Sequence, residues 1–309
     1  MKALVAALVL FAAAAHAQTP TIGLATGAPG GGFLDYGNAV AEAVRGQVDV
    51  RVRQTTGTAE NLRLVETGAS ECALAVAGPA YEAWNGLEAW TEGRRMTALR
   101  AVAPMYETSF HALAPGASGI ADMAALAGRR VGVGPARGTG ELTFRAVMEA
   151  TGLTATLEFG APNAQADALV EGRLDAFWFG AGLPVPAFDA AAKRADMRVI
   201  GLSGDARAAT IRRLPYLAPA IIPAGTYRRQ DQAVESVAVW NLVVCRADVS
   251  ASAVATFARA LFDRRAVIAA RIPAAEGTRA ANAARVTVMP FHVGVVPVYR
   301  DAGVAVAVQ

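Results

Sequence analysis

Short apolar runs alternate with helical patterns along most of this chain, and that alternation constrains the fold more than any other feature of the sequence. The first part reads as strand and helix in turn, over residues 21–25, 35–45, 48–54, 59–67, 72–77 and 80–84. A β-α-β-α-β order of this kind favours a parallel sheet covered by helices.

A second unit of the same kind follows a β-rich interruption. The interruption holds two predicted strands, residues 99–105 and 109–113, with little helix. The alternation then resumes over residues 130–134, 141–151, 154–159, 163–171, 174–179, 184–193 and 198–202. Another β-rich stretch at 236–244 precedes mainly helical sequence from Ser250 onward.

Two α/β units joined by extended segments predict two lobes with a cleft between them. The chain would cross near residues 104–110 and return near 237–244. We therefore predict that lobe 1 consists of residues 18–107 plus 238–309 and that lobe 2 consists of residues 108–237.

The N-terminus predicts export. Met1 and Lys2 give a short positive start, an apolar run follows, and Ala15-His16-Ala17 has the small-residue pattern of a cleavage site. These features indicate a signal peptide over residues 1–17. A membrane anchor is the alternative, but the apolar run is shorter than the roughly 20 residues that span a bilayer.

The charge distribution argues against a nucleic-acid partner. The formal net charge is +3, and the arginines are scattered among acids instead of forming a basic run with interleaved aromatic residues. Export permits a disulfide between Cys72 and Cys245, yet their apolar surroundings favour two buried thiols. No Cys or His spacing suits a metal, and we expect no cofactor.

Four loops follow predicted strands, where ligands of open α/β sheets bind. The first, residues 26–33, is rich in glycine, which lets backbone N–H groups approach an anion at a helix N-terminus. A plain turn is the alternative, because the glycine spacing fits no nucleotide-binding motif. In the second, Thr58 is an N-cap candidate, and a ligand contact through Asn61 is the alternative.

In the third loop, Gly78 permits close approach and the Tyr81 hydroxyl can bond a ligand. The alternative is a helix that begins at Pro79 and buries the tyrosine. The fourth loop, residues 134–141, offers backbone amides and Arg137 to a carboxylate or phosphate. Arg137 could equally be a solvated charge paired with Glu141.

Several short motifs follow one another in a specific order along the chain. They are the glycine-rich start at 22–33, Thr-Gly-Thr-Ala-Glu-Asn-Leu-Arg-Leu at 56–64, Ala-Tyr-Glu-Ala-Trp-Asn-Gly at 80–86, the segment 175–184, Ile-Pro-Ala-Gly-Thr-Tyr at 222–227 and Pro-Phe-His at 290–292. Together, over nearly the whole mature chain, they resemble the TAXI family of solute-binding proteins that serve TRAP transporters.

That resemblance implies a type II-like periplasmic-binding-protein fold, with a mixed sheet flanked by helices in each lobe. It also implies a monomeric periplasmic receptor that holds a small carboxylate, such as glutamate or 2-oxoglutarate, in the inter-lobe cleft. The receptor would deliver this acid to an ion-coupled TRAP permease in the membrane.

With the loops considered above, the resemblance points to a set of ligand-binding candidates. They are Gly31, Gly32, Phe33, Thr55, Thr58, Asn61, Gly78, Tyr81, Arg137, Gly138, Thr139, Glu141, Phe179 and Gly180. The sequence departs from the family pattern at Phe33, at residues 77–79 and at residues 137–141. These departures favour a ligand that is less amino, more anionic or more apolar than glutamate.

Two other functions share parts of this pattern. A sensor that presents its ligand to a signalling partner would carry every one of these motifs. An enzyme could use His111 and His292 with a nearby acid, but no nucleophile elbow or Cys-His arrangement accompanies them. We therefore predict a protein without catalytic residues.

Overall fold

The computed structural model describes residues 19–87, 89–214 and 216–308, so the predicted signal peptide lies outside the described residues. The strands are β1 (Thr21–Ala25), β2 (Asp49–Arg53), β3 (Cys72–Val76), β4 (Leu99–Pro115), β5 (Arg130–Gly132), β6 (Thr156–Glu158), β7 (Ala176–Ala181), β8 (Met197–Ile200), β9 (Ala218–Ile222) and β10 (Val234–Arg246). The helices are α1 (Gly32–Ala43), α2 (Thr58–Glu66), α3 (Ala77–Asn85), α4 (Thr139–Thr151), α5 (Pro162–Val170), α6 (Pro186–Arg194), α7 (Gly204–Arg213), α8 (Ala251–Asp263), α9 (Arg265–Ala269) and α10 (Val296–Asp301).

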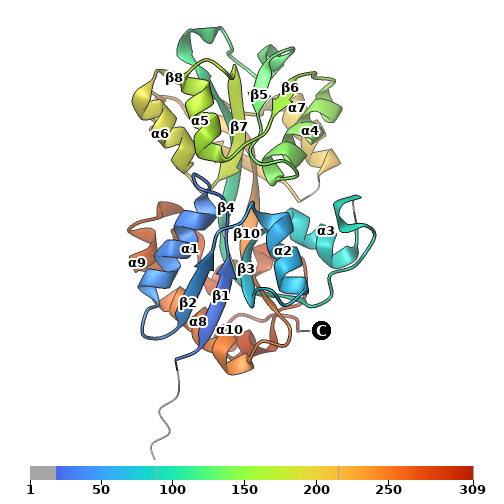
Figure 1. Cartoon of the computed structure of the whole chain (residues 1–309), viewed down its shortest axis with the longest axis vertical. Helices are drawn as coiled ribbons and strands as arrows, with labels where there is room; N and C mark the ends of the chain where they lie inside the picture. Colours follow the sequence, from blue (N-terminus) through green and yellow to red (C-terminus); the bar gives the residue numbers. More distant parts are fainter. Residues whose placement is uncertain (1–18, 88, 215, 309) are drawn as a thin grey trace, which may run out of the picture.

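The molecule has two lobes, one above the other in Figure 1. The lower lobe holds β1–β3 with α1–α3 and the C-terminal helices, and the upper lobe holds β5–β8 with α4–α7. The strands join in the order β2-β1-β3-β10-β4-β7-β5-β6, with β8 beside β4 and β9 beside β10. Pairs at the two ends are parallel, and the central pairs are antiparallel. The predicted two-lobed α/β fold is therefore confirmed, although one continuous mixed sheet runs through both lobes instead of a separate sheet in each.

Strands β4 and β10 run through both lobes and connect them. The lower part of β10, Asn241 to Cys245, pairs with β3, and its upper part, Val234 to Ala238, pairs with β9. The predicted lobe boundaries at 107/108 and 237/238 fall inside these two long strands, and they stay a prediction.

A bulge interrupts the β4–β10 ladder between the lobes. The register shifts between Trp240 and Leu242, where the facing residue is Pro104, which has no N–H to donate. The Asn241 side chain makes the bonds that the ladder lacks here. Its Nδ2 donates to the Tyr106 carbonyl at 2.8 Å, and its Oδ1 accepts from the Thr108 hydroxyl at 2.9 Å.

One expectation about the elements was wrong, and two elements were missed. Residues 99–113 form one strand instead of two, because the polar residues 107–109 lie inside the ladder where it crosses between the lobes. Helix α7 and strand β9 were not predicted. In α7 only Thr210 is buried, so its sequence carries little apolar periodicity.

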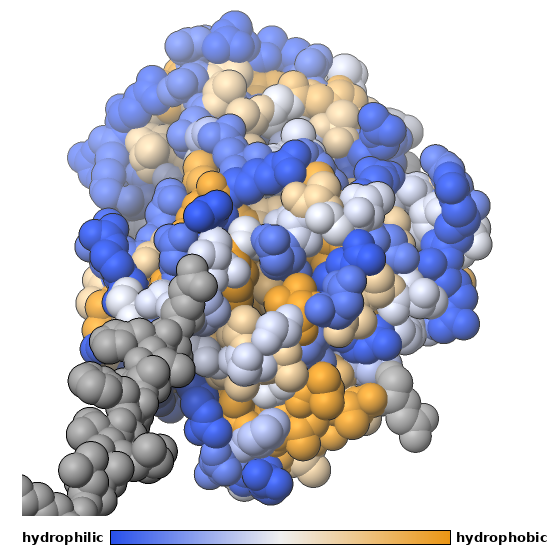
Figure 2. Space-filling model, turned by 60° about the horizontal axis from the view of Figure 1, so that its bottom comes forward, coloured by the Kyte–Doolittle hydropathy of each residue, from blue (hydrophilic) through white to orange (hydrophobic). Residues whose placement is uncertain are grey.

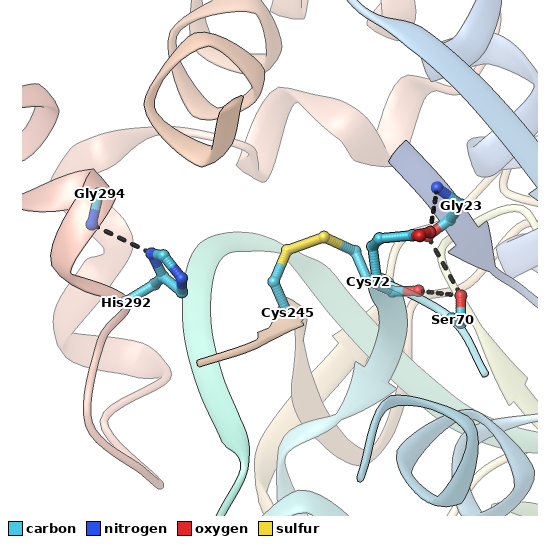
Figure 3. Close-up of a disulfide and its surroundings, with 7 residues drawn as sticks. Gly23, Ser70, Cys72, Cys245, His292 and Gly294 are labelled. Carbon is cyan, nitrogen blue, oxygen red and sulfur yellow. Dashed lines mark hydrogen bonds between the residues drawn. A yellow bond between two sulfur atoms is a disulfide. The ribbon is translucent and has the colours of Figure 1, made fainter. Parts of the chain in front are cut away.

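The expectation of two buried thiols was also wrong. Cys72 and Cys245 face each other across the antiparallel β3–β10 pair, with Cα atoms 3.9 Å apart, and form a disulfide. Figure 3 shows the bridge between His292 on one side and Ser70 and Gly23 on the other. Both cysteines are fully buried. The disulfide therefore ties two strands of the lower lobe together inside its core.

The described surface is mixed in character. Figure 2 shows polar residues over most of one face, with an apolar patch at its lower edge. Within the described ranges, no helix is long and apolar enough to cross a membrane.

Candidate functional site

A small cavity lies where the two lobes meet, with a volume of about 60 Å³. Its walls are glycine, alanine, proline, threonine and phenylalanine side chains and loop backbone from both lobes. Eight of the predicted site residues line it: Gly31, Gly32, Phe33, Thr58, Gly138, Thr139, Phe179 and Gly180. A volume of this size holds a few water molecules or one small polar group.

Five helices begin at this cavity. Residues of their first turns or N-caps line it in each case, namely Gly31 for α1, Thr58 for α2, Val76 for α3, Thr139 for α4 and Pro162 for α5. In none of these five helices does the side chain of the N-cap residue itself bond the first turn. The first N–H groups of a helix have no partner inside it, and the helix dipole makes this end positive.

No charged side chain lines this inner cavity among the described residues. The acids in the first turns of α1, α2 and α4 line neighbouring cavities instead, as Asp35, Glu60 and Glu141. Three of the five helices thus carry an acid in their first turn, but none of these carboxylates lines the inner cavity, where the helix N-termini favour an anionic ligand group.

Three threonine hydroxyls reach the cavity from different elements. Thr58 Oγ1 accepts the backbone N–H of Val76 at 3.2 Å, so its own proton is available to a ligand. Thr108 lies on β4 and donates to Asn241. The Thr139 hydroxyl has no hydrogen-bond partner among the described residues.

The second loop serves a different purpose from the one predicted. Gly57, not Thr58, occupies the N-cap of α2, so the capping interpretation of Thr58 was wrong. Asn61 is fully buried, with its Nδ2 donating to the Thr26 and Leu74 carbonyls and its Oδ1 accepting from Thr55. All three partners belong to the lower lobe, so these bonds occupy the Asn61 amide there. Asn61 and Thr55 therefore position the loop, and Thr55 borders the wider opening of the cleft.

Arg137 and Glu141 line a second, outer cavity of about 340 Å³. The alternative of an ion pair between them is wrong, because the Glu141 carboxylate pairs with Arg145, through Oε1 at 2.8 Å. The carboxylate accepts instead the backbone N–H of Arg137 at 2.6 Å, which holds the loop in its turn at a φ of 60°. The inner and outer cavities share Thr56, Gly57, Thr58, Gly138 and Thr139.

Gly78 and Tyr81 line neither cavity. A Cβ atom on Gly78 would lie 2.3 Å from Cε2 of the Tyr216 ring, so the close approach is to a side chain of the other lobe. The Tyr216 hydroxyl donates to Glu82 at 3.1 Å. Tyr81 is 46% exposed, which also contradicts the alternative of a buried tyrosine.

A second contact between the lobes lies beside α1. Gly30 has a φ of 83°, and a Cβ atom there would lie 2.0 Å from Oδ1 of Asn163 on α5. The lobes thus touch through Gly30 on one side and through Gly78 on the other. The inner cavity is lined by residues of both lobes as well.

The two histidines of the enzyme alternative lie in different places. His111 is fully buried in the upper lobe, where its Nε2 lies 2.8 Å from the Tyr227 hydroxyl and its Nδ1 lies 3.2 Å from the Ser109 carbonyl. Burial lowers the pKa of His111 to about 3. His292 accepts the Gly294 N–H beside the disulfide, and burial lowers its pKa too. Neither histidine lines the inner or the outer cavity.

Other cavity residues have weaker signals in the sequence. Thr56, Thr108, Pro135 and Pro162 also line the inner cavity and are not among the predicted site residues. Pro135 lies in the fourth predicted loop, and Pro162 follows the predicted strand at 154–159, so the rule that ligands bind after strands applies to both. Thr108 depends on how β4 crosses between the lobes.

Two lobes that close over a cavity at their helix N-termini are the architecture of periplasmic solute-binding proteins, and solved structures of that class match this fold. The structure of the periplasmic binding protein BugD matches with 14% identity and a TM-score of 0.59, covering 94% of this chain and 99% of that one. MatC from Rhodopseudomonas palustris, solved with bound malate, matches with 12% identity and a TM-score of 0.58, covering 92% and 96%. A further structure, described as a periplasmic transporter, matches with 13% identity and a TM-score of 0.56, covering 85% and 89%.

The chain belongs to the NMT1-like family, which matches residues 24–303. At these identities the solved structures establish the fold of this protein and not its ligand.

Proposed function

We propose that this protein is an extracytoplasmic solute receptor of the TAXI type, which binds a small carboxylate between its lobes. The observation that carries this proposal is the inner cavity, where five helix N-termini converge and no described charged side chain lies. Backbone N–H groups and the Thr58 and Thr139 hydroxyls supply donors for carboxylate oxygens. Glutamate, 2-oxoglutarate and related acids are the candidates.

Binding would be a physical event without a covalent step. A ligand that bridges the first turns of α1 and α2 in one lobe and of α4 in the other contacts both lobes only when they are closed. This difference in contacts lets the ligand shift the population toward the closed state. A closed, loaded receptor is the form that a TRAP permease would recognise, and the malate in MatC shows an acid held by a protein of this fold.

A thermal-shift screen tests the carboxylate proposal. The purified protein is heated with glutamate, 2-oxoglutarate and succinate, and with the uncharged amide of each acid. A ligand at 100 times its Kd adds about 2.7 kcal/mol to the free energy of unfolding, so the correct acid raises Tm by several degrees. The amides should leave Tm unchanged. Equal shifts from the acids and their amides would refute an anion site.

Transport, sensing and catalysis are separated by further measurements. Delivery to a permease predicts that deleting the gene abolishes uptake of the radiolabelled ligand. Unimpaired uptake would favour the sensor. Recovery of the ligand unchanged after long incubation with the protein is expected of a receptor, whereas conversion of the ligand would show an enzyme.

A further inference from the structure

We propose that the outer cavity is a second anion subsite, so that this receptor selects ligands with a distal acidic group well separated from the first. The inference rests on the proposed function, because the first carboxylate must occupy the inner cavity. It concerns Arg63, Arg137 and Arg145, which line the outer cavity and not the inner one.

The outer cavity continues the inner one. The two share the first residues of α2 and α4, and the outer volume of about 340 Å³ is several times the inner volume of about 60 Å³. A ligand whose carboxylate fills the inner cavity therefore extends along these helices into the outer one.

Helix geometry sets the spacing between the two subsites. Arg63 lies five residues after Thr58 on α2, and Arg145 lies six residues after Thr139 on α4. At 1.5 Å per residue, their Cα atoms lie roughly 7–9 Å farther along the helices than the residues that line the inner cavity. Arg137 lies nearer, because it directly precedes Gly138, which lines both cavities. A longer acid should therefore reach Arg63 in addition to Arg137.

The charges of the outer cavity favour an anion. Three arginines line it, against two acids, Glu60 and Glu141. Glu141 pairs with Arg145, whereas among the described residues Glu60 accepts only the N–H and hydroxyl of Thr56 and keeps its charge, so the arginines outnumber the acids by one. Arg63 and Arg137 form no ion pair with any described residue. One N–H of Arg63 is bonded to the Trp90 carbonyl, and its other N–H groups can donate to a ligand.

Closure of the lobes completes the wall of this subsite. Arg63 Nη2 donates to the Trp90 carbonyl at 3.0 Å, and its Cζ lies 5.5 Å from the centre of the Trp90 ring. Trp90 Nε1 in turn donates to Glu82, the same carboxylate that accepts the hydroxyl of Tyr216 from the upper lobe. The contact between the lobes therefore fixes the tryptophan on which Arg63 rests.

Calorimetric titration with two matched ligand series tests the proposal. One series contains the dicarboxylates succinate, adipate and suberate, and the other contains butyrate, hexanoate and octanoate. We expect the dicarboxylate of each pair to bind more tightly, with an advantage that grows to about tenfold at the longer lengths. In Arg63→Gln and Arg137→Gln the advantage should fall severalfold, while the affinities for the monocarboxylates stay within twofold of wild type.

Arg198→Gln, which removes an exposed arginine of β8 that lines neither cavity, is the matched control and should change nothing. A dicarboxylate advantage that survives in both cavity variants would overturn the subsite and leave the proposed function intact. The subsite would also be overturned if hexanoate and octanoate bound more tightly than adipate and suberate, because the outer cavity would then favour an apolar group. No binding of any acid in either series would overturn the subsite, and if glutamate and 2-oxoglutarate also failed to bind, the proposed function would be refuted as well.

Discussion

At the scale of single residues, the threonines of the inner cavity differ in what else depends on them. Thr58 holds the Val76 N–H, so its replacement would also disturb the lobe. The hydroxyl of Thr139 has no described partner, so it can be removed without leaving an unsatisfied group behind.

Thr139→Val should weaken binding of the carboxylate about tenfold. The change deletes one hydrogen bond to a charged group, worth about 1.5 kcal/mol, and keeps the shape of the side chain. Isothermal titration calorimetry measures the loss. Thr139→Ser retains the hydroxyl and should bind like wild type, and Tm without ligand should be nearly the same in all three proteins. Equal affinities of the valine and serine variants would remove Thr139 from the binding site.

His111 makes the stability of the upper lobe sensitive to acid. Its pKa is about 3 in the folded state because burial disfavours the charged ring, against an ordinary value of about 6.5 in the unfolded chain. Between these two values the unfolded chain binds a proton that the folded protein does not. The contribution of the neutral, buried His111 ring to the free energy of unfolding is therefore complete above pH 6.5. It is lost as the pH falls toward 3, by up to about 1.4 kcal/mol per pH unit.

Unfolding in urea at several pH values checks this prediction. The free energy of unfolding of wild type should fall more steeply from pH 6.5 to pH 4 than that of His111→Gln. The slopes should differ by up to about 1.4 kcal/mol per pH unit, which corresponds to one proton. Contributions of the carboxylates and of His292 remain in both proteins and cancel in the comparison. Parallel curves would mean that His111 does not control the acid sensitivity.

At the scale of elements, the loops were more predictable than their surroundings. The glycines at 30–32 and 138 follow strands and precede helices, which is a local signal, and they do lie at the inner cavity or its edge. The role of Gly78 was not predictable, because the aromatic ring against it belongs to Tyr216, far along the chain. The same limit applies to the disulfide, since Cys72 and Cys245 are 173 residues apart and meet only because β3 pairs with β10.

The contact between the α1 loop and α5 gives an element-level prediction. In Gly30→Ala, the new methyl group would clash with Asn163 and hold the lobes apart. We expect affinity for the acid to fall about tenfold or more. Small-angle X-ray scattering with saturating ligand should give a larger radius of gyration than for wild type.

Gly46→Ala is the matched control for that variant. Gly46 has a φ of 86°, similar to the 83° of Gly30, but a Cβ atom there meets nothing within 4 Å. Both variants therefore carry the same backbone strain, about 1–2 kcal/mol, and only one obstructs closure. If both lost affinity to the same extent, strain and not the contact between the lobes would be the cause.

At the scale of the whole molecule, the interactions within the lower lobe differ from those that connect the two lobes. The disulfide and the β3–β10 pairing lie within the lower lobe, whereas the strands that cross between lobes carry a bulge at Pro104 and Asn241. Rigid lobes joined by an irregular ladder suit a protein whose ligand shifts an open state toward a closed one.

This division predicts that the disulfide supports stability without affecting binding. The double variant Cys72→Ala, Cys245→Ala should lose about 2–5 kcal/mol of unfolding free energy, because the bridge closes a long loop in the unfolded chain. Unfolding in urea measures this loss. Titration of the double variant with the acid, at a temperature where it stays folded, should give the wild-type Kd, since neither cysteine lines the inner or the outer cavity. A large drop in affinity with intact folding would instead show that the bridge controls the geometry of the cleft, through β10 and the bulge at Asn241.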